Sequence, residues 1–373
     1  MSARRTRVLH VIQNLNYGGM ERLLADIVRR DDPARFENHV MALQYLGRFA
    51  EGLGDVAELH LARPMGRASM LWPRALAEQM RRIAPDVVHT HSGVWYKAGL
   101  AARHAGVPRL IHTEHGRERP DPWTARMIDG LAARRTDVVV AVSEVLARQL
   151  ADTVVRGAAR IHVVRNGVDT ELHRPRPDSG AIRTELGIAA DRPILGSIGR
   201  LEPIKGYDVM IEAFARLLAD WPDDAPRPAL LLAGEGSERP ALERRAAELG
   251  LAGDVRFLGW RDDVADLHSA FALFTMSSRS EGTSVSLLEA MSAGLCPVVT
   301  DVGGNAAVLG PALRHRLVPA EDPAALAAAW RDALEAAERR REDGARARQR
   351  VMDEFSLATM VRAYEALYEG RLA

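Results

Sequence analysis

Short runs of aliphatic and β-branched residues alternate with amphipathic stretches along the first part of the chain. This alternation is typical of βαβ units, in which a helix follows each strand and returns the chain to start a parallel neighbour. The pattern therefore predicts a parallel sheet with helices between most of its strands. The predicted strands are residues 7–12, 39–43, 56–61, 87–90, 110–113, 138–142 and 161–164.

A second series of the same kind follows a turn at residues 166–169 and a proline-rich stretch at 173–177, which we interpret as a linker. Its predicted strands are 194–198, 229–233, 255–258, 272–276 and 297–300, with helices that include 207–218 and 239–249.

After this second series, residues 322–350 have the Ala, Arg and Glu content and the spacing of helices, and residues 355–368 read as a last amphipathic helix. We therefore expect an amino-terminal domain at 1–175, a carboxyl-terminal domain at 176–354, and a final helical segment at 355–373 that crosses back to the first domain.

Length and charge fit a two-domain protein and exclude several classes. At 373 residues the chain is long enough for two domains, each with its own core. The 50 Lys and Arg residues balance 50 Asp and Glu residues, so no bulk charge favours nucleic acid as a partner. The single cysteine, Cys296, excludes an internal disulfide and a Cys-rich metal site, and its apolar neighbours indicate a buried strand residue in a cytoplasmic protein.

No segment predicts insertion into a membrane. The first seven residues lead into a strand without the apolar core of a secretion signal, and no apolar run approaches the ~20 residues that span a bilayer. Residues 63–82 combine apolar side chains, such as Leu71 and Trp72, with five arginines. This stretch fits either peripheral contact with anionic lipid at the cytoplasmic face of a membrane or a partly buried helix with a solvated arginine face. The pattern leaves both interpretations open.

Two glycines, Gly18 and Gly19, stand between the first predicted strand and the helix that follows it. Glycines at such a turn let the backbone approach an anion, and the amino terminus of the helix directs amide donors toward that anion. The spacing G-x-G-x-x-G is absent here, after Ile198, and at residues 234–237. Its absence argues against a nicotinamide-dependent dehydrogenase.

The loop after the strand 194–198 carries two cations five residues apart, Arg200 and Lys205. A planar guanidinium and a compact ammonium together suit a diphosphate whose negative charge grows as it leaves. Lys97 and Lys205 are the only two lysines of the chain, so arginine stands at every other basic position. A lysine kept at 205 suggests a site that requires this side chain rather than a solvated loop charge.

Two glutamates flank the start of a predicted helix after the strand 272–276. Glu281 lies on the loop, and Glu289 lies about a turn into the helix among apolar residues, where a carboxylate needs a partner. Open α/β sheets bind phosphates at helix amino termini that follow the carboxyl ends of parallel strands, and carboxylates there can accept hydrogen bonds from sugar hydroxyls.

Histidines concentrate at the ends of two predicted strands of the first domain, as His89, His91, His112 and His115. Alternate histidines on a strand could converge on a metal ion. Neighbouring positions point to opposite faces of a sheet, however, and the sequence indicates no third ligand. A histidine that binds or orients a sugar fits better, so we predict no metal site.

These motifs, in this order, resemble the retaining glycosyltransferases of family 4, also called glycosyl transferases group 1. The resemblance extends from the Gly18-Gly19 loop to the last helix, and its most specific part is the pair Glu281 and Glu289 with seven residues between them. It implies the α/β GT-B fold, with two Rossmann-like domains facing each other across a cleft. The first domain of that fold binds the acceptor and the second binds a nucleotide-sugar donor.

The resemblance also implies roles for single residues. Gly18 and Gly19 would approach a phosphate of the donor, and His115 would contact the sugar near the reaction centre. Arg200 and Lys205 are similar to the family's diphosphate clamp. The resemblance thus implies four catalytic residues: His115, Arg200, Lys205 and Glu281.

The remaining implied roles fall around the predicted helix start. Glu281 is similar to the carboxylate that holds the hydroxyls of the transferred sugar, and Glu289 to the one that binds the ribose. Thr283, Ser284 and Val285 line the phosphate, with backbone amides near Ser284 and Val285 as donors.

The chain departs from the family at two places. Thr283-Ser284 stands where the family often has a bulky aromatic residue and then glycine, which affects the shape of the sugar pocket. Ala307 stands where a glutamate is common, and no role is assigned to it.

The implied reaction moves a sugar from a UDP- or GDP-linked donor to a hydroxyl of a carbohydrate or lipid-linked acceptor. It retains the anomeric configuration and uses neither a cofactor nor a metal. The overall pattern is similar to a subgroup from bacterial exopolysaccharide clusters. Three alternatives stay open: a glycoside hydrolase that uses Glu281 and Glu289, a nucleotide-sugar epimerase, and a non-catalytic component that binds nucleotide sugars.

Overall fold

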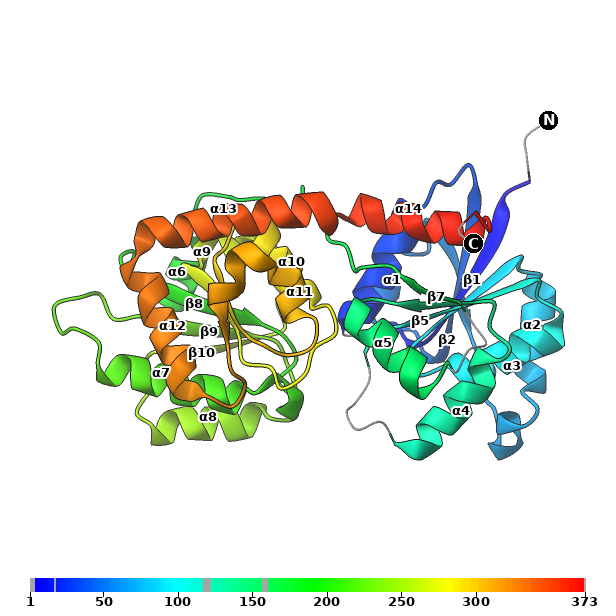
Figure 1. Ribbon diagram of the computed structural model, residues 1–373, viewed down its shortest axis with the longest axis horizontal. Coiled ribbons are helices and arrows are strands. Elements are labelled where there is room, and N and C mark those ends of the chain that lie inside the picture. The colour runs from blue at the N-terminus through cyan, green and yellow to red at the C-terminus, as the bar shows by residue number, and fades with distance from the viewer. Residues whose placement is uncertain (1–3, 17, 117–121, 156–159, 372–373) are drawn as a thin grey trace. The chain divides into compact units, whose positions relative to one another are not determined.

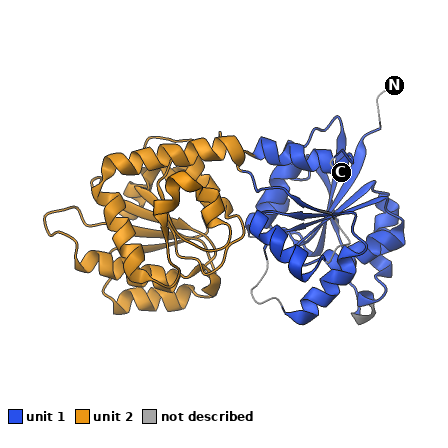
Figure 2. Ribbon diagram, in the orientation of Figure 1, with its two compact units in different colours: residues 1–167, 357–373 blue, residues 168–356 orange. Residues whose placement is uncertain are grey.

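Two α/β units make up the chain, and each contains one parallel sheet. In this computed structural model, which describes residues 4–16, 18–116, 122–155 and 160–371, unit 1 is Met1–Gly167 with Leu357–Ala373, and unit 2 is Val168–Ser356 (Figure 2). Helices cover both faces of each sheet, as Figure 1 shows. The parallel sheets and the Rossmann-like units agree with the predicted fold class.

The sheet of unit 1 has the strand order β3-β2-β1-β4-β5-β6-β7. Its strands are β1 (Thr6–Asn14), β2 (Phe36–Tyr45), β3 (Ala57–Leu61), β4 (Val87–His91), β5 (Arg109–Glu114), β6 (Val138–Ala141) and β7 (Arg160–Val163). Its helices are α1 (Gly19–Arg30), α2 (Arg74–Ile83), α3 (Trp95–Ala105), α4 (Trp123–Ala133) and α5 (Glu144–Thr153), with short 3₁₀ turns η1 (Arg48–Ala50) and η2 (Arg67–Met70). The chain reverses its direction of winding between β1 and β4, which is where such sheets bind ligands.

Unit 2 repeats this topology with the order β10-β9-β8-β11-β12-β13. Its strands are β8 (Ile194–Ile198), β9 (Ala229–Ala233), β10 (Val255–Gly259), β11 (Leu273–Met276), β12 (Pro297–Thr300) and β13 (Leu317–Val318). Its helices are α6 (Ala181–Leu186), α7 (Tyr207–Ala219), α8 (Arg239–Glu248), α9 (Val264–Ala270), α10 (Val285–Ser292), α11 (Asn305–Leu309), α12 (Pro323–Glu335) and α13 (Ala337–Glu354), with 3₁₀ turns η3 (Pro203–Lys205) and η4 (Pro311–Arg316). The point of reversal here lies between β8 and β11.

Every predicted strand is present, with ends that differ by a few residues. Strand β13 was not predicted, because a strand of two residues leaves no periodic pattern. The helical stretch predicted at 322–350 is two helices, since the chain breaks at Ala336, whose φ and ψ are −94° and 69°. The last helix, α14 (Leu357–Tyr368), begins two residues later than predicted, after Phe355 ends α13.

The division between the units falls at 167/168, eight residues before the expected boundary at 175/176. Residues 168–175 belong to unit 2 because they are bound to it: the amide of Val168 donates to the carbonyl of Phe355 at 2.9 Å, and the imidazole of His173 lies 3.4 Å from the carboxylate of Glu289. The second division, at 356/357, lies two residues after the expected one.

Helix α14 belongs to unit 1, although it follows unit 2 in sequence (Figure 2). It packs on α1 and reaches the sheet through two buried tyrosines. The hydroxyl of Tyr368 lies 2.9 Å from Nδ1 of His89, and that of Tyr364 lies 3.4 Å from the hydroxyl of Thr113. Arg35 forms an ion pair with Glu365 at 2.8 Å. The carboxyl-terminal segment therefore closes one face of the first sheet.

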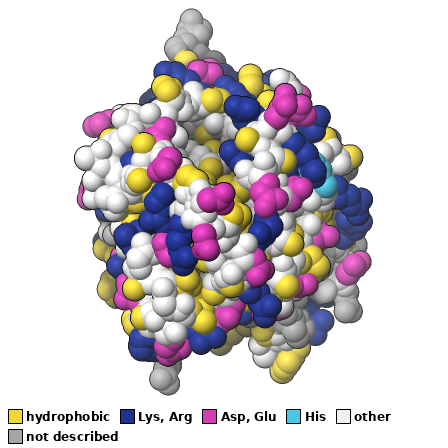
Figure 3. All heavy atoms as spheres, turned by 90° about the vertical axis from the view of Figure 1, so that its left-hand side faces the viewer, with side chains coloured by type: hydrophobic (Ala, Val, Ile, Leu, Met, Phe, Trp, Pro, Cys, Tyr) yellow, Lys and Arg dark blue, Asp and Glu magenta, His cyan; other side chains and the backbone are white. Residues whose placement is uncertain are grey.

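The surface agrees with the even charge of the chain. On the face turned to the viewer in Figure 3, basic and acidic side chains are interspersed, without a large field of one sign. Within the described residues, no helix combines the length and the apolar character that crossing a bilayer requires. Cys296 is a buried free thiol in the core of unit 2, as predicted, but it lies one residue before β12 and not within the strand. Burial raises its pKa to about 11.

Residues 63–82 contain a partly buried helix, and exposed apolar side chains precede it. Helix α2 buries Leu76 and Met80, while its arginines are exposed, which is the partly buried helix. Before this helix, the side chains of Leu71 and Trp72 are 81% and 56% exposed.

Candidate active site

Lys205 and Glu281 meet at the carboxyl ends of β8 and β11. Lys205 ends the 3₁₀ turn η3, and its Nζ donates to Oε1 of Glu281 at 2.6 Å. The hydroxyl of Ser278 donates to the same oxygen, also at 2.6 Å. The two side chains are only 21% and 7% exposed, so this ion pair is shielded from water. The structure thus joins two predicted site residues that are 76 positions apart in the sequence.

The backbone around Lys205 is fixed by close contact with the end of β11. Gly206 has φ +62°, and a β-carbon there would lie 2.2 Å from the carbonyl oxygen of Ser277, so the turn requires glycine. The hydroxyl of Ser277 donates to the carbonyl of Gly206 at 2.7 Å. The amide of Arg279 donates to the carbonyl of Ile204 at 2.8 Å. These contacts hold Lys205 beside Glu281.

Residues 234–237, which lack a dinucleotide-binding pattern, pack against the loop that carries Arg200 and Lys205. A β-carbon on Gly236 would lie 2.2 Å from the carbonyl oxygen of Leu201, so the two turns approach closely. The amide of Leu201 donates to the carbonyl of Glu235 at 2.9 Å. The glycines at this turn therefore serve backbone packing.

Arg200 lies on this loop but does not join the ion pair. Its side chain is exposed, and among the described residues no hydrogen bond or ion pair links it to Lys205 or Glu281. The hydroxyl and amide of Ser237 lower the pKa of Glu202 by hydrogen bonding, and the charge of Arg200 adds to this effect. Arg200 is thus a peripheral cation of the loop in this structure.

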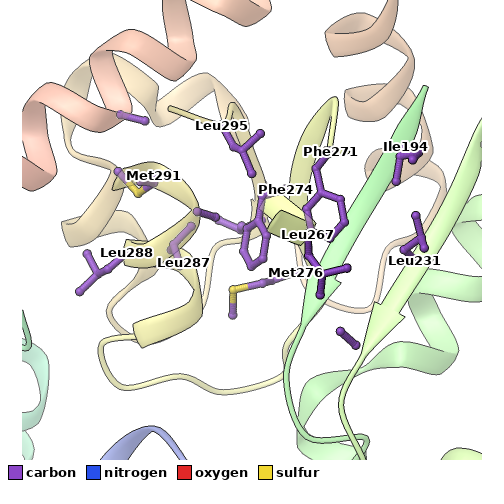
Figure 4. Packing of buried hydrophobic residues seen from close by; sticks show 14 of the residues in the cluster. Ile194, Leu231, Leu267, Phe271, Phe274, Met276, Leu287, Leu288, Met291 and Leu295 are labelled. Atoms are coloured by element: carbon purple, nitrogen blue, oxygen red, sulfur yellow. The ribbon is translucent and has the colours of Figure 1, made fainter. Parts of the chain in front are cut away.

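Helix α10 starts four residues after Glu281 and presents its amino terminus at the same edge of the sheet. Ser284 is its N-cap, and the hydroxyl of Ser284 accepts a hydrogen bond from the amide of Leu287 at 3.4 Å. Figure 4 shows Leu287, Leu288 and Met291 of this helix within the hydrophobic core that includes Phe274 and Met276 of β11. The amides of Val285 and Ser286, before Leu287, have no acceptors within the helix, so they can bind an anion.

The loop that carries Glu281 is held by a second pair of glycines. Gly303 has φ +55°, and a β-carbon there would lie 1.7 Å from the carbonyl oxygen of Glu281. The amide of Gly304 donates to the carbonyl of Gly282 at 3.1 Å. Ala307, where the family commonly has glutamate, offers its carbonyl to Arg350 at 2.7 Å.

Glu289 is buried and lies beside His173, a residue to which the sequence motifs gave no role. Its Oε1 is 3.4 Å from Nε2 of His173, and both side chains are nearly inaccessible to solvent. His173 comes from the proline-rich stretch after the 166–169 turn. The expected partner of this intrahelical carboxylate therefore exists, but only the fold brings it near.

In unit 1, His115 follows β5 and lies beside His91. Nδ1 of His91 and Nε2 of His115 are 3.2 Å apart, and the amide of His115 donates to the hydroxyl of Ser92 at 2.8 Å. Burial lowers the pKa of His115 to about 4, although the neighbouring carboxylate of Glu114 opposes this shift. The imidazole is consequently neutral at neutral pH and can either donate or accept a proton in a hydrogen bond.

A third histidine, His10 of β1, lies on the same face as His89 and His91, and nitrogen atoms of these three residues lie within 4.8 Å of one another. His10 was not among the predicted site residues, although the usual strand order places the first strand beside the fourth. His89 already uses both ring nitrogens, one with Tyr368 at 2.9 Å and one with Thr113 at 2.7 Å. His89 therefore has no ring nitrogen left for a metal ion unless it gives up one of these hydrogen bonds, although the fold does supply the third histidine that the sequence pattern did not indicate.

Next to these histidines, unit 1 contains a pocket of about 600 Å³. Lys97, the second of the two lysines, lines it together with Glu114 and Asp129. The pocket also has apolar and hydroxyl-bearing walls, to which Trp95, Tyr96 and Ser92 contribute. Such a mixture of aromatic and polar groups suits a polyhydroxylated ligand.

Gly18 and Gly19 occupy the predicted position between β1 and α1. Gly19 is the first residue of α1, and the carbonyl of Gly18 accepts a hydrogen bond from the amide of Arg22 at 3.2 Å. Tyr17 of the same loop lies outside the described residues.

Comparison with known proteins identifies the family. The sequence profile described as Glycosyltransferase Family 4 matches residues 17–172, and the one described as Glycosyl transferases group 1 matches residues 178–350. A D-inositol 3-phosphate glycosyltransferase of Geodermatophilus obscurus is 33% identical over 313 residues, which cover 77% of this chain and 68% of that protein. The chain belongs to glycosyltransferase family 4. As a member of this family, it is a glycosyltransferase.

A second relative is also a glycosyltransferase by name, and solved structures share the fold. EpsF of Bacillus subtilis, a glycosyltransferase by its name, is 27% identical over 326 residues, or 81% of this chain and 80% of EpsF. The structure of HepE from Anabaena with UDP and glucose aligns with a TM-score of 0.85 and 22% identity over 98% of this chain and 100% of HepE. The lipopolysaccharide glycosyltransferase WaaG aligns with a TM-score of 0.74 and 18% identity over 97% and 100% of the two chains. The predicted GT-B fold is thereby confirmed.

Proposed function

We propose that the protein transfers a sugar from a nucleoside-diphosphate sugar to an acceptor hydroxyl, with retention of the anomeric configuration. The observation that carries this proposal is the shielded ion pair of Lys205 and Glu281 beside the amino terminus of α10. This arrangement offers cationic and amide groups to a diphosphate and a carboxylate to sugar hydroxyls at one edge of one sheet. Structures of HepE, a protein with the same fold, contain UDP or UDP-glucose, which supports a UDP-linked donor.

The chemistry of the leaving group assigns Lys205 its role. An ammonium has three N–H donors, so Lys205 can keep its bond to Glu281 while it donates to a phosphate oxygen. As the bond between the anomeric carbon and the diphosphate breaks, negative charge grows on that oxygen. The ammonium, the amides near Ser284 and Val285, and the more distant charge of Arg200 stabilise it there.

The acceptor hydroxyl attacks from the side on which the diphosphate leaves, and its proton passes to a leaving phosphate oxygen. This route forms the new bond on the same face of the sugar and needs no carboxylate nucleophile and no metal ion. In the proposed complex, Glu281 accepts hydrogen bonds from the sugar, Glu289 and its partner His173 lie at the ribose, and His115 binds the sugar through its neutral imidazole. The Gly18-Gly19 loop approaches the donor phosphate.

The contacts of Glu281 also speak against a glycoside hydrolase. A hydrolase of the usual kind needs one carboxylic acid that donates a proton to the leaving oxygen. Oε1 of Glu281 instead accepts from both Lys205 and Ser278, which are the contacts of a hydrogen-bond acceptor.

For the acceptor, we propose that the 600 Å³ pocket of unit 1 binds a carbohydrate or a lipid-linked sugar of bacterial exopolysaccharide or glycolipid synthesis. Its size and its mixture of aromatic, hydroxyl and carboxylate groups support a sugar ring. The involvement of WaaG in lipopolysaccharide biosynthesis is consistent with such an acceptor.

The proposed reaction is tested by a donor screen in excess chelator. We expect one class among UDP-, GDP- and ADP-sugars to stabilise the protein and to be slowly hydrolysed, with release of the sugar in its original anomeric configuration. At a donor concentration a hundred times Kd, binding adds about 2.7 kcal/mol to the free energy of unfolding. Thermal shift measures the stabilisation by the donor, and ¹H NMR before mutarotation measures the hydrolysis and the anomeric configuration of the released sugar. Strict dependence on Mn²⁺, or release of the inverted anomer, would contradict the mechanism.

The exposed Leu71 and Trp72 support peripheral contact with a membrane, which we propose as a second property. Exposed apolar side chains next to the basic residues Arg63 and Arg74 can insert among anionic headgroups. We expect the protein to float with anionic vesicles at low salt, and the variant Leu71→Asn/Trp72→Gln to remain with the unbound fraction. Equal flotation of both proteins would place the membrane contact elsewhere.

A further inference from the structure

A second group of histidines lies at the β3 edge of the first sheet, on the other side of β1 from β4 and β5. His39 is on β2, and Glu58 and His60 are on β3, next to it in the sheet. Positions two apart on a strand point to the same face, which brings Glu58 and His60 together and places His39 beside Glu37. The four side chains line an open pocket of about 350 Å³.

Three groups in this pocket converge as metal ligands do. Nδ1 of His39 lies 3.0 Å from Nε2 of His60. The carboxylate of Glu58 lies 3.5 Å from Nδ1 of His39 and 3.8 Å from Nε2 of His60. One ligand atom from each residue lies within 4.8 Å of the others, a separation that a single ion can bridge with small side-chain movements.

The hydrogen bond of Nε2 of His39 to Glu37 determines that Nδ1 is the ring nitrogen facing His60 and Glu58. Nε2 lies 3.1 Å from Oε1 of Glu37, and Nε of Arg7 donates to that same oxygen at 2.8 Å. A carboxylate held by arginine accepts only, so Nε2 of His39 is the ring nitrogen that donates to Glu37 and Nδ1 is the one available to a metal ion. Nδ1 therefore directs a lone pair toward His60 and Glu58. A carboxylate behind a histidine is the arrangement that orients histidine ligands in zinc proteins.

We infer that His39, His60 and Glu58 form a binding site for a divalent transition metal, with zinc as the ion that best fits two imidazoles and one carboxylate. The positions left open would be filled by water, since the pocket is accessible. Three arginines also line it, but the charge of Arg7 is balanced by Glu37, and Arg63 and Arg82 are exposed at its border. The ligand set itself carries the single negative charge of Glu58.

The position of this site indicates a structural function. Strand β3 is an edge of the sheet, held within it by β2 alone. An ion bound to His39 of β2 and to two residues of β3 would tie this edge strand to its neighbour. The site lies away from the carboxyl ends of β1, β4 and β5, so it is independent of the proposed transferase reaction.

Titration of the untagged, chelator-treated full chain with Co²⁺ tests the inference, because Co²⁺ reports imidazole ligands in its visible spectrum. We expect one ion per chain with a visible spectrum, displacement of that spectrum by Zn²⁺, and a higher Tm with Zn²⁺. His60→Gln and Glu58→Gln should lose this one-to-one binding. Glu37→Gln should weaken it by about 10- to 100-fold, as the loss of such supporting carboxylates does.

His104→Gln is the matched control, since His104 is a partly exposed histidine of the same unit that does not line this pocket. It should bind Co²⁺ as the wild type does. Equal Tm values of all variants in chelator would show that they fold. The inference is overturned if the wild type binds no stoichiometric ion, or if His60→Gln binds as tightly as the wild type, which would leave His39 and His60 as a hydrogen-bonded pair.

Discussion

Replacing Lys205 with alanine should lower kcat for sugar transfer by about 10²- to 10³-fold, the usual cost of removing one donor that stabilises charge in a transition state. The shielded position of the ammonium makes its charge effective, because little water screens it. KM for the donor should rise less than kcat falls, since the charge on the diphosphate is largest as the bond breaks. Initial rates at saturating and limiting donor measure both constants.

The ion pair with Glu281 predicts a second result for the same experiment. Removal of Lys205 leaves a buried carboxylate without its cation, so Lys205→Ala also perturbs Glu281. The double variant Lys205→Ala/Glu281→Ala should therefore be little worse than the poorer single variant, because residues that act as a unit are not additive.

Arg216→Ala provides a control, since Arg216 is an exposed cation on α7, the helix that follows Lys205. It should retain full activity. If Lys205→Ala retains wild-type kcat while Arg216→Ala behaves normally, the proposed role of Lys205 in stabilising the leaving group is wrong.

The largest expected effect on stability concerns a buried ion pair in unit 2. Nε of Arg316 donates to Oδ2 of Asp343 at 2.8 Å, and these side chains are 1% and 0% exposed. Nε2 of His315 lies 2.9 Å from the same oxygen. Asp343→Ala should reduce the free energy of unfolding of unit 2 by about 3 kcal/mol, the low end of the cost of breaking a buried pair, because the buried guanidinium keeps only its second partner, Asp332, at 2.7 Å. A total stability of about 5–15 kcal/mol is typical of a domain, so much of it would be lost.

Chemical denaturation followed by circular dichroism measures this loss. Glu342→Gln is the matched control on the same helix, because its pair with Arg346 is about half exposed on both sides and contributes at most about 1 kcal/mol. Replacing both buried partners, as in Arg316→Met/Asp343→Leu, should recover most of the stability, since buried pairs can be exchanged for apolar ones. An Asp343→Ala variant as stable as Glu342→Gln would contradict this account.

The pH dependence of the same pair has a definite sign. Burial raises the pKa of Asp343, but hydrogen bonds from His315 and Arg316 outweigh this effect and hold the pKa below its ordinary value. The stabilisation of the folded state by the Asp343 carboxylate is therefore complete at neutral pH. It is lost as acid protonates this carboxyl group in the folded protein.

The sequence by itself determined the alternation of strands and helices and the family of this protein. Strands such as 194–198 and 229–233 were predicted to the residue, because apolar runs between turn residues depend on neighbours a few positions away. Lys205 and Glu281 could be recognised singly for a similar reason. Each lies in a short motif whose residue types and spacing point to its chemistry.

Only the tertiary structure decided which side chains become partners. The pairs of Lys205 with Glu281, His173 with Glu289, and His39 with His60 depend on strand order, on register and on where the chain returns. A one-residue shift in register would turn a side chain to the opposite face of its sheet, so local patterns cannot fix such contacts. The division at 167/168 has the same origin, because residues 168–175 belong to unit 2 through contacts with segments far along the chain.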